Sequence, residues 1–296
     1  MDLHILDLNF QNVPETIASY LLIGPDGPVL VETGPGSTLG ALQAGLAQHG
    51  VAPGDVRHVF VTHIHLDHAG AAGWWAQQGA QIYVHPFGAP HLIDPSRLLK
   101  SASRIYGDKM DSLWGDFLPA PAERVTAVHD GAVVEAAGLT FHVIETPGHA
   151  RHHHVYRVAD LAFTGDIAGI RLPSIPFMDV PAPPPEFELE VWQESIDRLL
   201  AEPLRTIYPT HFGPITAVAD HLIALRDLLP ETAVVVKQML EAGLDRDEMV
   251  SQYYEWNRNR ARQLGISDAA IHQYETANPW YMSVDGIVRY WQKQGV

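Results

Sequence analysis

The 296-residue chain contains no cysteine. This absence excludes disulfide bonds, a thiolate nucleophile and zinc sites with cysteine ligands, so any metal must be bound through nitrogen and oxygen. The sequence also has no apolar run long enough to cross a bilayer. Its first residues, Met1–Asp7, include acidic side chains where a secretory signal peptide carries basic ones. We therefore expect a cytoplasmic protein without a membrane partner.

Basic residues are scarce as well. The chain has 19 Lys and Arg against 35 Asp and Glu, which gives a formal net charge of −16. Nucleic-acid binding depends on cationic side chains that displace counterions, so this balance opposes a nucleic-acid partner and favours a small-molecule substrate. A hydrophobic content of 46% with 18% charged residues is ordinary for a folded soluble protein.

Histidine, in contrast, is frequent, with 17 residues, and it is concentrated in the stretch Thr62–His68. This stretch holds three imidazoles and a carboxylate within seven residues. It follows the apolar run Val59–Val61, which predicts a buried strand, and precedes Ala69–Ala76, which indicates the start of a helix. Polar groups on such a strand-to-helix connection can be aimed at one point by a rigid scaffold.

The spacing within this stretch has a direct physical meaning. In a nearly extended backbone, residues two apart point the same way, so His63 and His65 can offer nitrogens to one ion. As the chain turns into the helix, Asp67 and His68 point elsewhere and can hold a second ion. A lone His-x-His would be unremarkable in a histidine-rich chain. The full string indicates a metal site suited to zinc, iron or manganese.

The string resembles the signature of the metallo-β-lactamase superfamily, including its glyoxalase II-like branch. Members are metallohydrolases with an αββα sandwich, so the resemblance implies an α/β (α+β) fold of that type. It also implies a further His after a turn, an Asp at a strand end and a final His. His149 follows a Pro-Gly turn, Asp166 follows the predicted strand 161–163, and His211 follows the predicted strand 205–208.

The resemblance implies two metal ions per chain, with zinc expected and iron or manganese as alternatives. One ion would be bound by His63, His65 and His149, the other by Asp67, His68 and His211, with Asp166 bridging both. Such an ion pair lowers the pKa of a bridging water from about 16 toward about 7 and so supplies hydroxide at neutral pH. Asp67 would take a catalytic role by orienting that hydroxide.

The expected function is therefore metal-dependent hydrolysis of a small ester, lactone, thioester or related substrate. A phosphodiesterase or ribonuclease of the same superfamily is one alternative, although the acidic balance opposes it. A non-haem iron oxidoreductase of the dioxygenase type is another. Flavodiiron relatives place Glu where this chain has His65, which favours zinc here. Quorum-sensing lactonases often carry Tyr at the position of Gly169, and no glutathione-binding pattern follows Asp166.

We expect a catalytic domain over residues 1–214 and a helical C-terminal extension over residues 215–296 that packs on it. Strands are predicted at residues 3–8, 17–23, 29–31, 59–61, 81–84, 124–128, 132–135, 140–145, 161–163 and 205–208. Helices are predicted at 39–49, 186–202, 216–229, 231–242, 247–264 and 285–294. We expect the aromatic residues of the extension to lie in its helix core; alternatively, they form a wall of the substrate site or the contact of a homodimer.

Four further segments have a less definite role. Residues 86–118 form an insertion of two or three short helices, either a flap or extra core; as a flap, it would bring Tyr106 and Trp114 to the substrate. Glu32 stands where the superfamily usually has an orienting Asp, and an ordinary turn residue fits nearly as well. The run His152–His154 is expected at the surface or in the core, not among the ligands. The proline-rich loop 171–185 is expected on the surface near the site.

Overall fold

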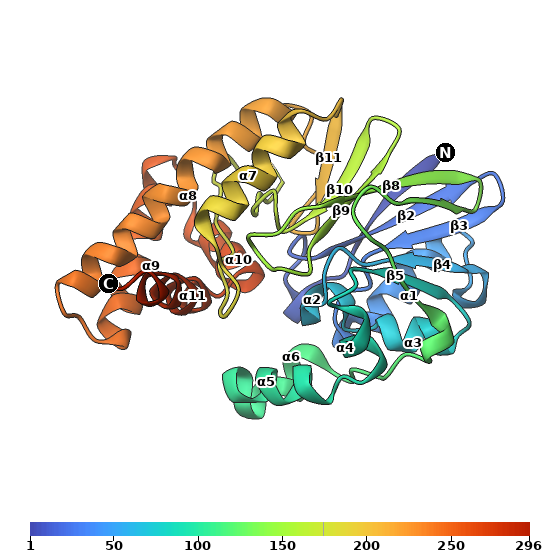
Figure 1. Cartoon of the computed structure of the whole chain (residues 1–296), viewed down its shortest axis with the longest axis horizontal. Coiled ribbons are helices and arrows are strands. Elements are labelled where there is room, and N and C mark those ends of the chain that lie inside the picture. The colour runs from blue at the N-terminus through green and yellow to red at the C-terminus, as the bar shows by residue number, and fades with distance from the viewer. Residues whose placement is uncertain (174) are drawn as a thin grey trace.

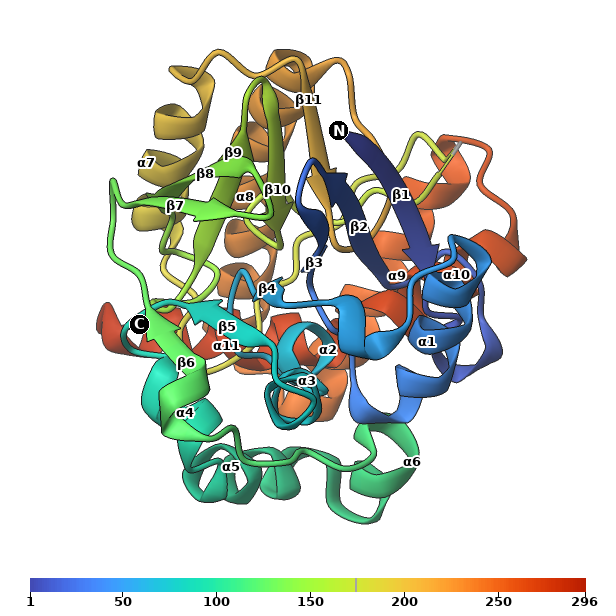
Figure 2. The same ribbon diagram turned by 90° about the vertical axis from the view of Figure 1, so that its right-hand side faces the viewer.

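The computed structural model describes residues 1–173 and 175–296, which form two mixed β-sheets packed face to face (Figures 1 and 2). The described residues form a six-stranded sheet in the order β1-β2-β3-β4-β5-β6 and a five-stranded sheet in the order β11-β10-β9-β8-β7. The first sheet contains β1 (Asp2–Asp7), β2 (Ala18–Gly24), β3 (Gly27–Val31), β4 (His58–Phe60), β5 (Gln81–Val84) and β6 (Val125–Ala127). The second contains β7 (Val133–Ala136), β8 (Leu139–Glu145), β9 (His154–Val158), β10 (Leu161–Gly165) and β11 (Thr206–Pro209).

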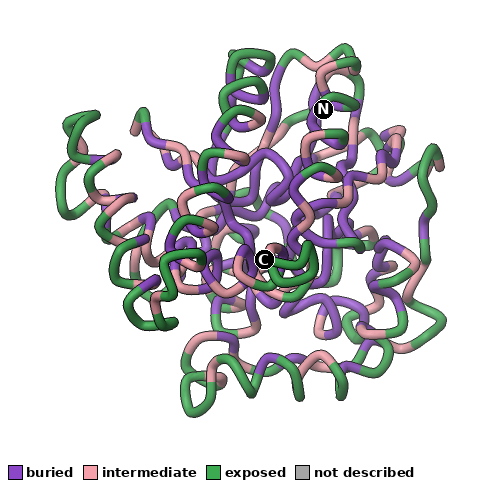
Figure 3. Tube along the Cα trace, turned by 60° about the vertical axis from the view of Figure 1, so that its left-hand side comes forward, coloured by how far each residue is buried: buried purple, intermediate pink, exposed green. Residues whose placement is uncertain are grey.

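The central strands of the first sheet, β2 to β5, are largely apolar on both faces, and the alternation of their side chains explains why they are buried between two layers. On β3, Val29 and Val31 belong to the core between the sheets, whereas Leu30 belongs to the core beneath the helices. On β4, Phe60 belongs to the core between the sheets and Val59 to the core beneath the helices. Figure 3 shows the resulting buried interior and the exposed trace around it.

Helices cover the outer face of each sheet. The helices α1 (Leu39–Gln48) and α3 (Ala72–Gln77) pack against the first sheet through Leu42, Leu46 and Trp75. The helix α7 (Leu189–Leu200) covers the second sheet and buries Trp192. The layers are thus helix, sheet, sheet and helix, which confirms the predicted αββα sandwich.

Four further helices follow the sandwich: α8 (Val218–Glu241), α9 (Arg246–Gln263), α10 (Asp268–Ala277) and α11 (Trp280–Lys293). Their buried side chains belong to the same hydrophobic core as the inner faces of the sheets. The extension therefore packs on the sandwich, while the expected boundary after residue 214 stays a prediction. Among the described residues, no helix is long and apolar enough to cross a membrane.

Helix boundaries in this extension differ from the prediction in three places. The predicted helices 216–229 and 231–242 form one continuous helix, α8, although Pro230 lies inside it. Pro230 cannot donate to the carbonyl of Arg226, but the side-chain amide of Gln193 donates to that carbonyl at 3.2 Å instead. The helix α10 was not predicted. The helix α11 begins at Trp280, five residues before the predicted start.

The sandwich itself contains two departures from the prediction. Strand β9 was missed, although it lies between β8 and β10. The described residues of the proline-rich loop 171–185 are mostly covered, so the prediction of a surface loop was wrong, whereas its predicted position near the candidate site is confirmed. Its residues Leu172, Phe177, Asp179 and Val180 are each about 1% exposed, because the C-terminal helices pack over them.

The insertion contains three short helices, as predicted: α4 (Ala89–Ile93), α5 (Ser96–Tyr106) and α6 (Met110–Trp114). Figure 1 shows α5 and α6 at the lower edge of the molecule, below α9 and α11. The insertion is attached to the sandwich at α6, where the Ser37 hydroxyl donates to the Leu113 carbonyl at 2.6 Å.

Candidate metal centre

All seven residues predicted from the sequence lie together at one edge of the sandwich. His63 and His65 follow strand β4, and Asp67 and His68 lie in the short helix α2 (Leu66–Ala69). The remaining three, His149, Asp166 and His211, follow β8, β10 and β11 respectively. The ends of strands from both sheets therefore bring residues almost 150 positions apart to one point.

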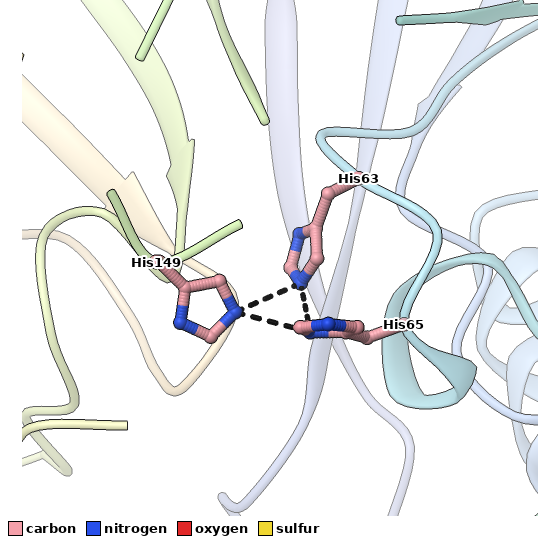
Figure 4. Close-up of side chains that lie close together, drawn as sticks. All are labelled: His63, His65 and His149. Atoms are coloured by element: carbon pink, nitrogen blue, oxygen red, sulfur yellow. Dashed lines mark hydrogen bonds between the residues drawn. The ribbon is translucent and has the colours of Figure 1, made fainter. Parts of the chain in front are cut away.

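Three imidazoles form the first group, shown in Figure 4. The His65 Nδ1 atom lies 2.8 Å from His63 Nε2 and 3.0 Å from His149 Nε2. The two Nε2 atoms of His63 and His149 are 3.3 Å apart. Nitrogens bound to one tetrahedral zinc ion are separated by about 3.3 Å, given zinc–nitrogen bonds near 2.05 Å. This group therefore has the donor type and spacing of a three-histidine metal site.

Asp67, His68 and His211 form a second group that could hold a metal ion. The Asp67 Oδ2 atom lies 3.4 Å from His211 Nε2 and 3.7 Å from His68 Nε2. Asp166 lies between the two groups. Its Oδ1 atom is 3.3 Å from His68 Nε2, and its Oδ2 atom is 3.4 Å from His149 Nε2. One carboxylate thus presents one oxygen to each group.

Two buried atoms of this centre have no hydrogen-bond partner among the described residues. These are His68 Nε2 and Asp166 Oδ1, which face one another. Buried polar atoms are normally satisfied, because an unpaired one costs about 1–3 kcal/mol. A cation between them would satisfy both. The nitrogen and oxygen donors, their spacing and these two unpartnered atoms all fit a bound divalent metal.

Backbone carbonyls fix the orientation of two of the imidazoles. His149 Nδ1 donates to the Pro181 carbonyl at 2.7 Å, and His211 Nδ1 donates to the Thr16 carbonyl at 2.6 Å. Each contact keeps the proton on Nδ1, so the unprotonated Nε2 points toward the centre and is free to bind a metal ion. The sequence does not reveal these two contacts, because the acceptor in each is a backbone carbonyl that any residue carries.

The electrostatic environment keeps both carboxylates ionised. Burial alone would raise the pKa of Asp67, but His68 and His211 lower it to about 2. Burial acts in the same direction on Asp166, yet His68, His211 and His149 hold its pKa well below the usual value. Burial lowers the pKa of His149 to about 4, which leaves its imidazole neutral at pH 7. His68 and His211 differ from His149: burial lowers their pKa, but Asp166 and Asp67 outweigh it and raise the pKa of both, so a metal bound there must displace their protons.

A cavity of about 920 Å³ opens over the centre and includes His65, Asp67 and Asp166 in its walls. The insertion contributes one wall and the C-terminal helices contribute another. Both residues proposed as substrate contacts, Tyr106 and Trp114, lie in the first wall. Trp114 is only 8% exposed and stacks on Phe10 at 5.5 Å, so the insertion is at once a cavity wall and part of the core.

The sequence of residues 13–211 matches the model of the Metallo-beta-lactamase superfamily, and the match ends on His211. The chain belongs to this superfamily. Its relatives include the probable metallo-hydrolase YqjP of Bacillus subtilis, which is 26% identical over 86% of this chain and 85% of its own length. The metallo-beta-lactamase fold-containing protein ST1585 of Sulfurisphaera tokodaii is 24% identical over 74% and 82% of the two chains.

The solved structure of the metallo-beta-lactamase family protein TTHA1429 from Thermus thermophilus has the same fold. It aligns with a TM-score of 0.71 at 22% identity and covers 99% of this chain and 94% of that chain. The alignment therefore extends beyond the part matched by the superfamily model and includes the C-terminal helices. At this identity the likeness shows the fold alone.

Glu32, which stands where this superfamily usually has Asp, lies directly behind the centre. Its carboxylate is 1% exposed and contacts His68 Nδ1 at 3.2 Å. It also accepts hydrogen bonds from the backbone and hydroxyl of Thr62 and, at 3.2 Å, from the Thr210 hydroxyl. The backbone of Glu32 has a φ of 65°, as a turn residue often does. Glu32 is thus both a turn residue and a carboxylate that contacts the candidate metal ligand His68.

The histidine run His152–His154 is buried. His152 is 8% exposed, and His153 and His154 are fully covered. Among the described residues, none of the three belongs to a candidate metal group. His153 Nε2 accepts a hydrogen bond from the Asp166 backbone at 3.2 Å, and its Nδ1 contacts the Thr146 hydroxyl at 2.9 Å. The run therefore belongs to the core, where His153 contacts the backbone of Asp166.

Proposed function

We propose that this chain is a metal-dependent hydrolase with a binuclear centre, with zinc as the metal, that cleaves a small ester, lactone, thioester or related substrate. The observation that carries the proposal is the position of Asp166, whose two oxygens lie at 3.3 and 3.4 Å from nitrogens of different histidine groups. Only a carboxylate can bind two cations a few ångströms apart in this way. A place in the glyoxalase II-like branch belongs to the same proposal.

Each part of the centre has a defined task in this proposal. His63, His65 and His149 would hold one ion, Asp67, His68 and His211 the other, and Asp166 both. Divalent ions so held lower the pKa of water toward 7 and thereby supply a nucleophile at neutral pH. No serine or cysteine nucleophile is then required.

Asp67 is suited to a catalytic role as well as to binding metal. Its side chain is 21% exposed and lines the cavity, whereas the other carboxylate, Asp166, is 5% exposed. Because its pKa is held at about 2, Asp67 accepts hydrogen bonds throughout the neutral range. It can therefore orient an attacking water toward the substrate in the cavity. The cavity wall that contains Tyr106 and Trp114 would exclude bulk water and hold the organic part of the substrate.

Three observations favour hydrolysis of a small molecule over the alternatives. A relative over most of the chain is a probable metallo-hydrolase. His65 supplies nitrogen where flavodiiron relatives supply a carboxylate, which favours zinc over iron. The net charge of −16 opposes an extended phosphate backbone as substrate.

The test is hydrolysis of a panel of esters, lactones, thioesters and phosphodiesters by the purified protein. We expect turnover of at least one carboxylic substrate, its loss on chelation and its recovery with added zinc. The variants His65→Ala and Asp166→Ala should remain folded by circular dichroism and lose turnover. Turnover that persists in the fully demetallated protein would overturn the proposal. If the protein preferred a phosphodiester or ribonucleic acid, the proposed ester, lactone or thioester class would be wrong and the enzyme would be a phosphodiesterase.

A further inference from the structure

The insertion contains a cluster of positive charge in a strongly acidic protein. Between residues 97 and 109 lie Arg97, Lys100, Arg104 and Lys109, with Asp108 as the single acidic residue. All four basic side chains are exposed. The chain as a whole has a formal net charge of −16, whereas this segment has a net positive charge. Most of it is the helix α5, followed by a short helical turn, Gly107–Lys109.

Only two of these four cations lie in the wall of the cavity. Arg97 and Lys109 line the cavity, whereas Lys100 and Arg104 do not. Neither Arg97 nor Lys109 forms an ion pair with a carboxylate of the described residues. The segment 97–109 thus places one cation of helix α5, Arg97, and one of the following turn, Lys109, in the cavity wall.

The acidic residues of the cavity wall already have partners. Glu186 pairs with Arg151 at 3.0 Å, and Glu275 pairs with Arg258 at 2.7 Å. The other two acidic residues of the wall, Asp67 and Asp166, belong to the metal centre. In the part of the wall that the structure describes, Arg97 and Lys109 are therefore the two basic side chains without an ion pair, although Asp94, outside the wall, lies near enough to Arg97 for their charges to interact.

Much of the wall that the cavity shares with the insertion and the C-terminal helices is apolar. The insertion contributes Leu98, Ala102, Ile105 and Leu113 together with the rings of Tyr106 and Trp114. Met282 and Ala277 line the cavity from the C-terminal helices. Such a surface suits hydrocarbon, since burying apolar area yields roughly 25 cal/mol per Å².

We propose that the substrate is an anionic amphiphile: an ester or thioester whose hydrocarbon chain lies along this wall and whose remote anionic group pairs with Arg97 and Lys109. This inference rests on the proposed hydrolytic function. In the reaction, water breaks the bond between the acyl carbon and the oxygen or sulfur. Its hydroxyl group ends on the acyl carbon, and its proton ends on the leaving atom. A carboxylate and a phosphate share the required charge, so the experiment must separate them.

The experiment compares three 4-nitrophenyl esters of equal chain length. The hexanoate ester is neutral, the monoester of adipic acid carries a terminal carboxylate, and the ester of 6-phosphonohexanoic acid carries a terminal phosphonate. A second set has ten-carbon chains. The wild type should show a kcat/KM about 10-fold higher for an anionic ester than for the neutral ester of equal length, and added salt should reduce this ratio. The phosphonate and carboxylate arms show which anion is preferred. Equal kcat/KM for neutral and anionic esters would overturn the inference while leaving the hydrolase proposal intact.

The segment 97–109 supplies its own matched control. The double variant Arg97→Ala/Lys109→Ala should lose the preference, with hydrolysis of the neutral ester within about 2-fold of wild type. The double variant Lys100→Ala/Arg104→Ala removes the same charge from the same segment and should keep the preference. If both double variants lost the preference for anionic esters equally, the positive charge of the whole segment would be its cause, and a binding site at Arg97 and Lys109 would be contradicted.

Calorimetry tests the inference without turnover and so separates it from the proposed function. Sebacate and decanoate have the same length, but only sebacate carries a second carboxylate. Sebacate should bind the wild type about 10-fold more tightly, and this difference should vanish in Arg97→Ala/Lys109→Ala. Equal affinities would refute the anion site even if no ester were cleaved.

Discussion

The Nδ1 atom of His149 donates a hydrogen bond of 2.7 Å to the carbonyl oxygen of Pro181. Pro181 lies in the loop between β10 and α7, and this loop is covered by the C-terminal helices. The candidate ligand His149 is thus oriented by a segment that lies 32 residues further along the chain. Ligand orientation in this centre depends on how that segment is held.

The residues on both sides of Pro181 are bound by helix α11 and the turn before it. The Ser283 hydroxyl donates to the Val180 carbonyl at 2.9 Å and accepts from the Ala182 backbone at 3.2 Å. Asn278 and Trp280 donate to the Asp179 carboxylate at 2.8 and 2.7 Å. These contacts link the C-terminal extension to His149 through the loop.

Gly286 is the position where a small change should disturb this link. A Cβ atom there would lie 2.0 Å from the Ala182 carbonyl oxygen, so Gly286→Ala must displace the segment that orients His149. We expect zinc affinity to fall by about 10-fold, the lower end of effects from residues that orient metal ligands. Equilibrium competition with a zinc-binding dye measures this affinity.

Two variants control this experiment. Gly40→Ala makes the same substitution in helix α1, where no atom from another part of the chain lies within 4 Å of the added Cβ, and should leave zinc affinity unchanged. Ser283→Ala removes three hydrogen bonds without adding bulk and should weaken zinc binding in the same direction as Gly286→Ala. Unchanged zinc affinity in a folded Ser283→Ala protein would show that the loop does not depend on this contact.

Tyr106 and Trp114 should respond differently to truncation, although both line the cavity. Trp114 is 8% exposed and packs on Phe10, so Trp114→Ala should lower the free energy of unfolding by about 3 kcal/mol. Tyr106 is only half-buried, so Tyr106→Ala should raise KM for an apolar substrate with a smaller loss of stability. Thermal unfolding and steady-state kinetics on the same preparations separate the two effects. A KM unchanged in Tyr106→Ala would show that this wall does not contact substrate.

Stability should fall between pH 7 and pH 5 because of buried histidines away from the metal centre. Burial lowers the pKa of His221 to about 4, and its Nε2 donates to the Ala168 carbonyl at 2.8 Å. The unfolded chain takes up this proton near pH 6.5, whereas the folded protein does so only near pH 4. Below pH 6.5 the proton therefore favours unfolding, and His221 alone should cost about 2 kcal/mol between pH 7 and 5.

Chemical denaturation at a series of pH values checks this slope. In His221→Gln the loss of stability between pH 7 and 5 should be smaller than in the wild type by about 2 kcal/mol. The exposed His49, replaced in the same way, serves as the control and should leave the wild-type slope unchanged. Identical slopes in His221→Gln and the wild type would contradict the buried neutral form.

Much of the fold follows from local sequence pattern, and the failures have specific physical causes. Strand β5 coincides with the predicted residues 81–84, because its apolar run is short and sharply bounded. The helix α8 was divided at Pro230, since a sequence alone does not show that Gln193 replaces the lost hydrogen bond. Strand β9 was missed because its buried His154 and partly buried Arg157 conceal an otherwise strand-like composition. The helix α10 has a detectable signal, as Ser267 caps it.

The candidate centre was more predictable than its surroundings. Side chains such as His63 and Asp166 show their chemistry in the sequence, and the spacing of the first string restricts where they point. The carbonyl contacts to His149 and His211 arise only from tertiary structure. The same is true of the cavity wall, since nothing in the sequence distinguishes Arg97 from Lys100 on one exposed helix.

The most direct test of the account is the number of zinc ions bound per chain by the wild type and by Asp166→Asn. Demetallated protein is titrated with zinc, and bound metal is measured after removal of weakly bound ions. We predict two ions for the wild type and fewer than two for Asp166→Asn, because this substitution removes the charge shared by both histidine groups. A wild type that retains one ion or none, or an Asp166→Asn protein that retains two with unchanged affinity, would contradict the bridged centre.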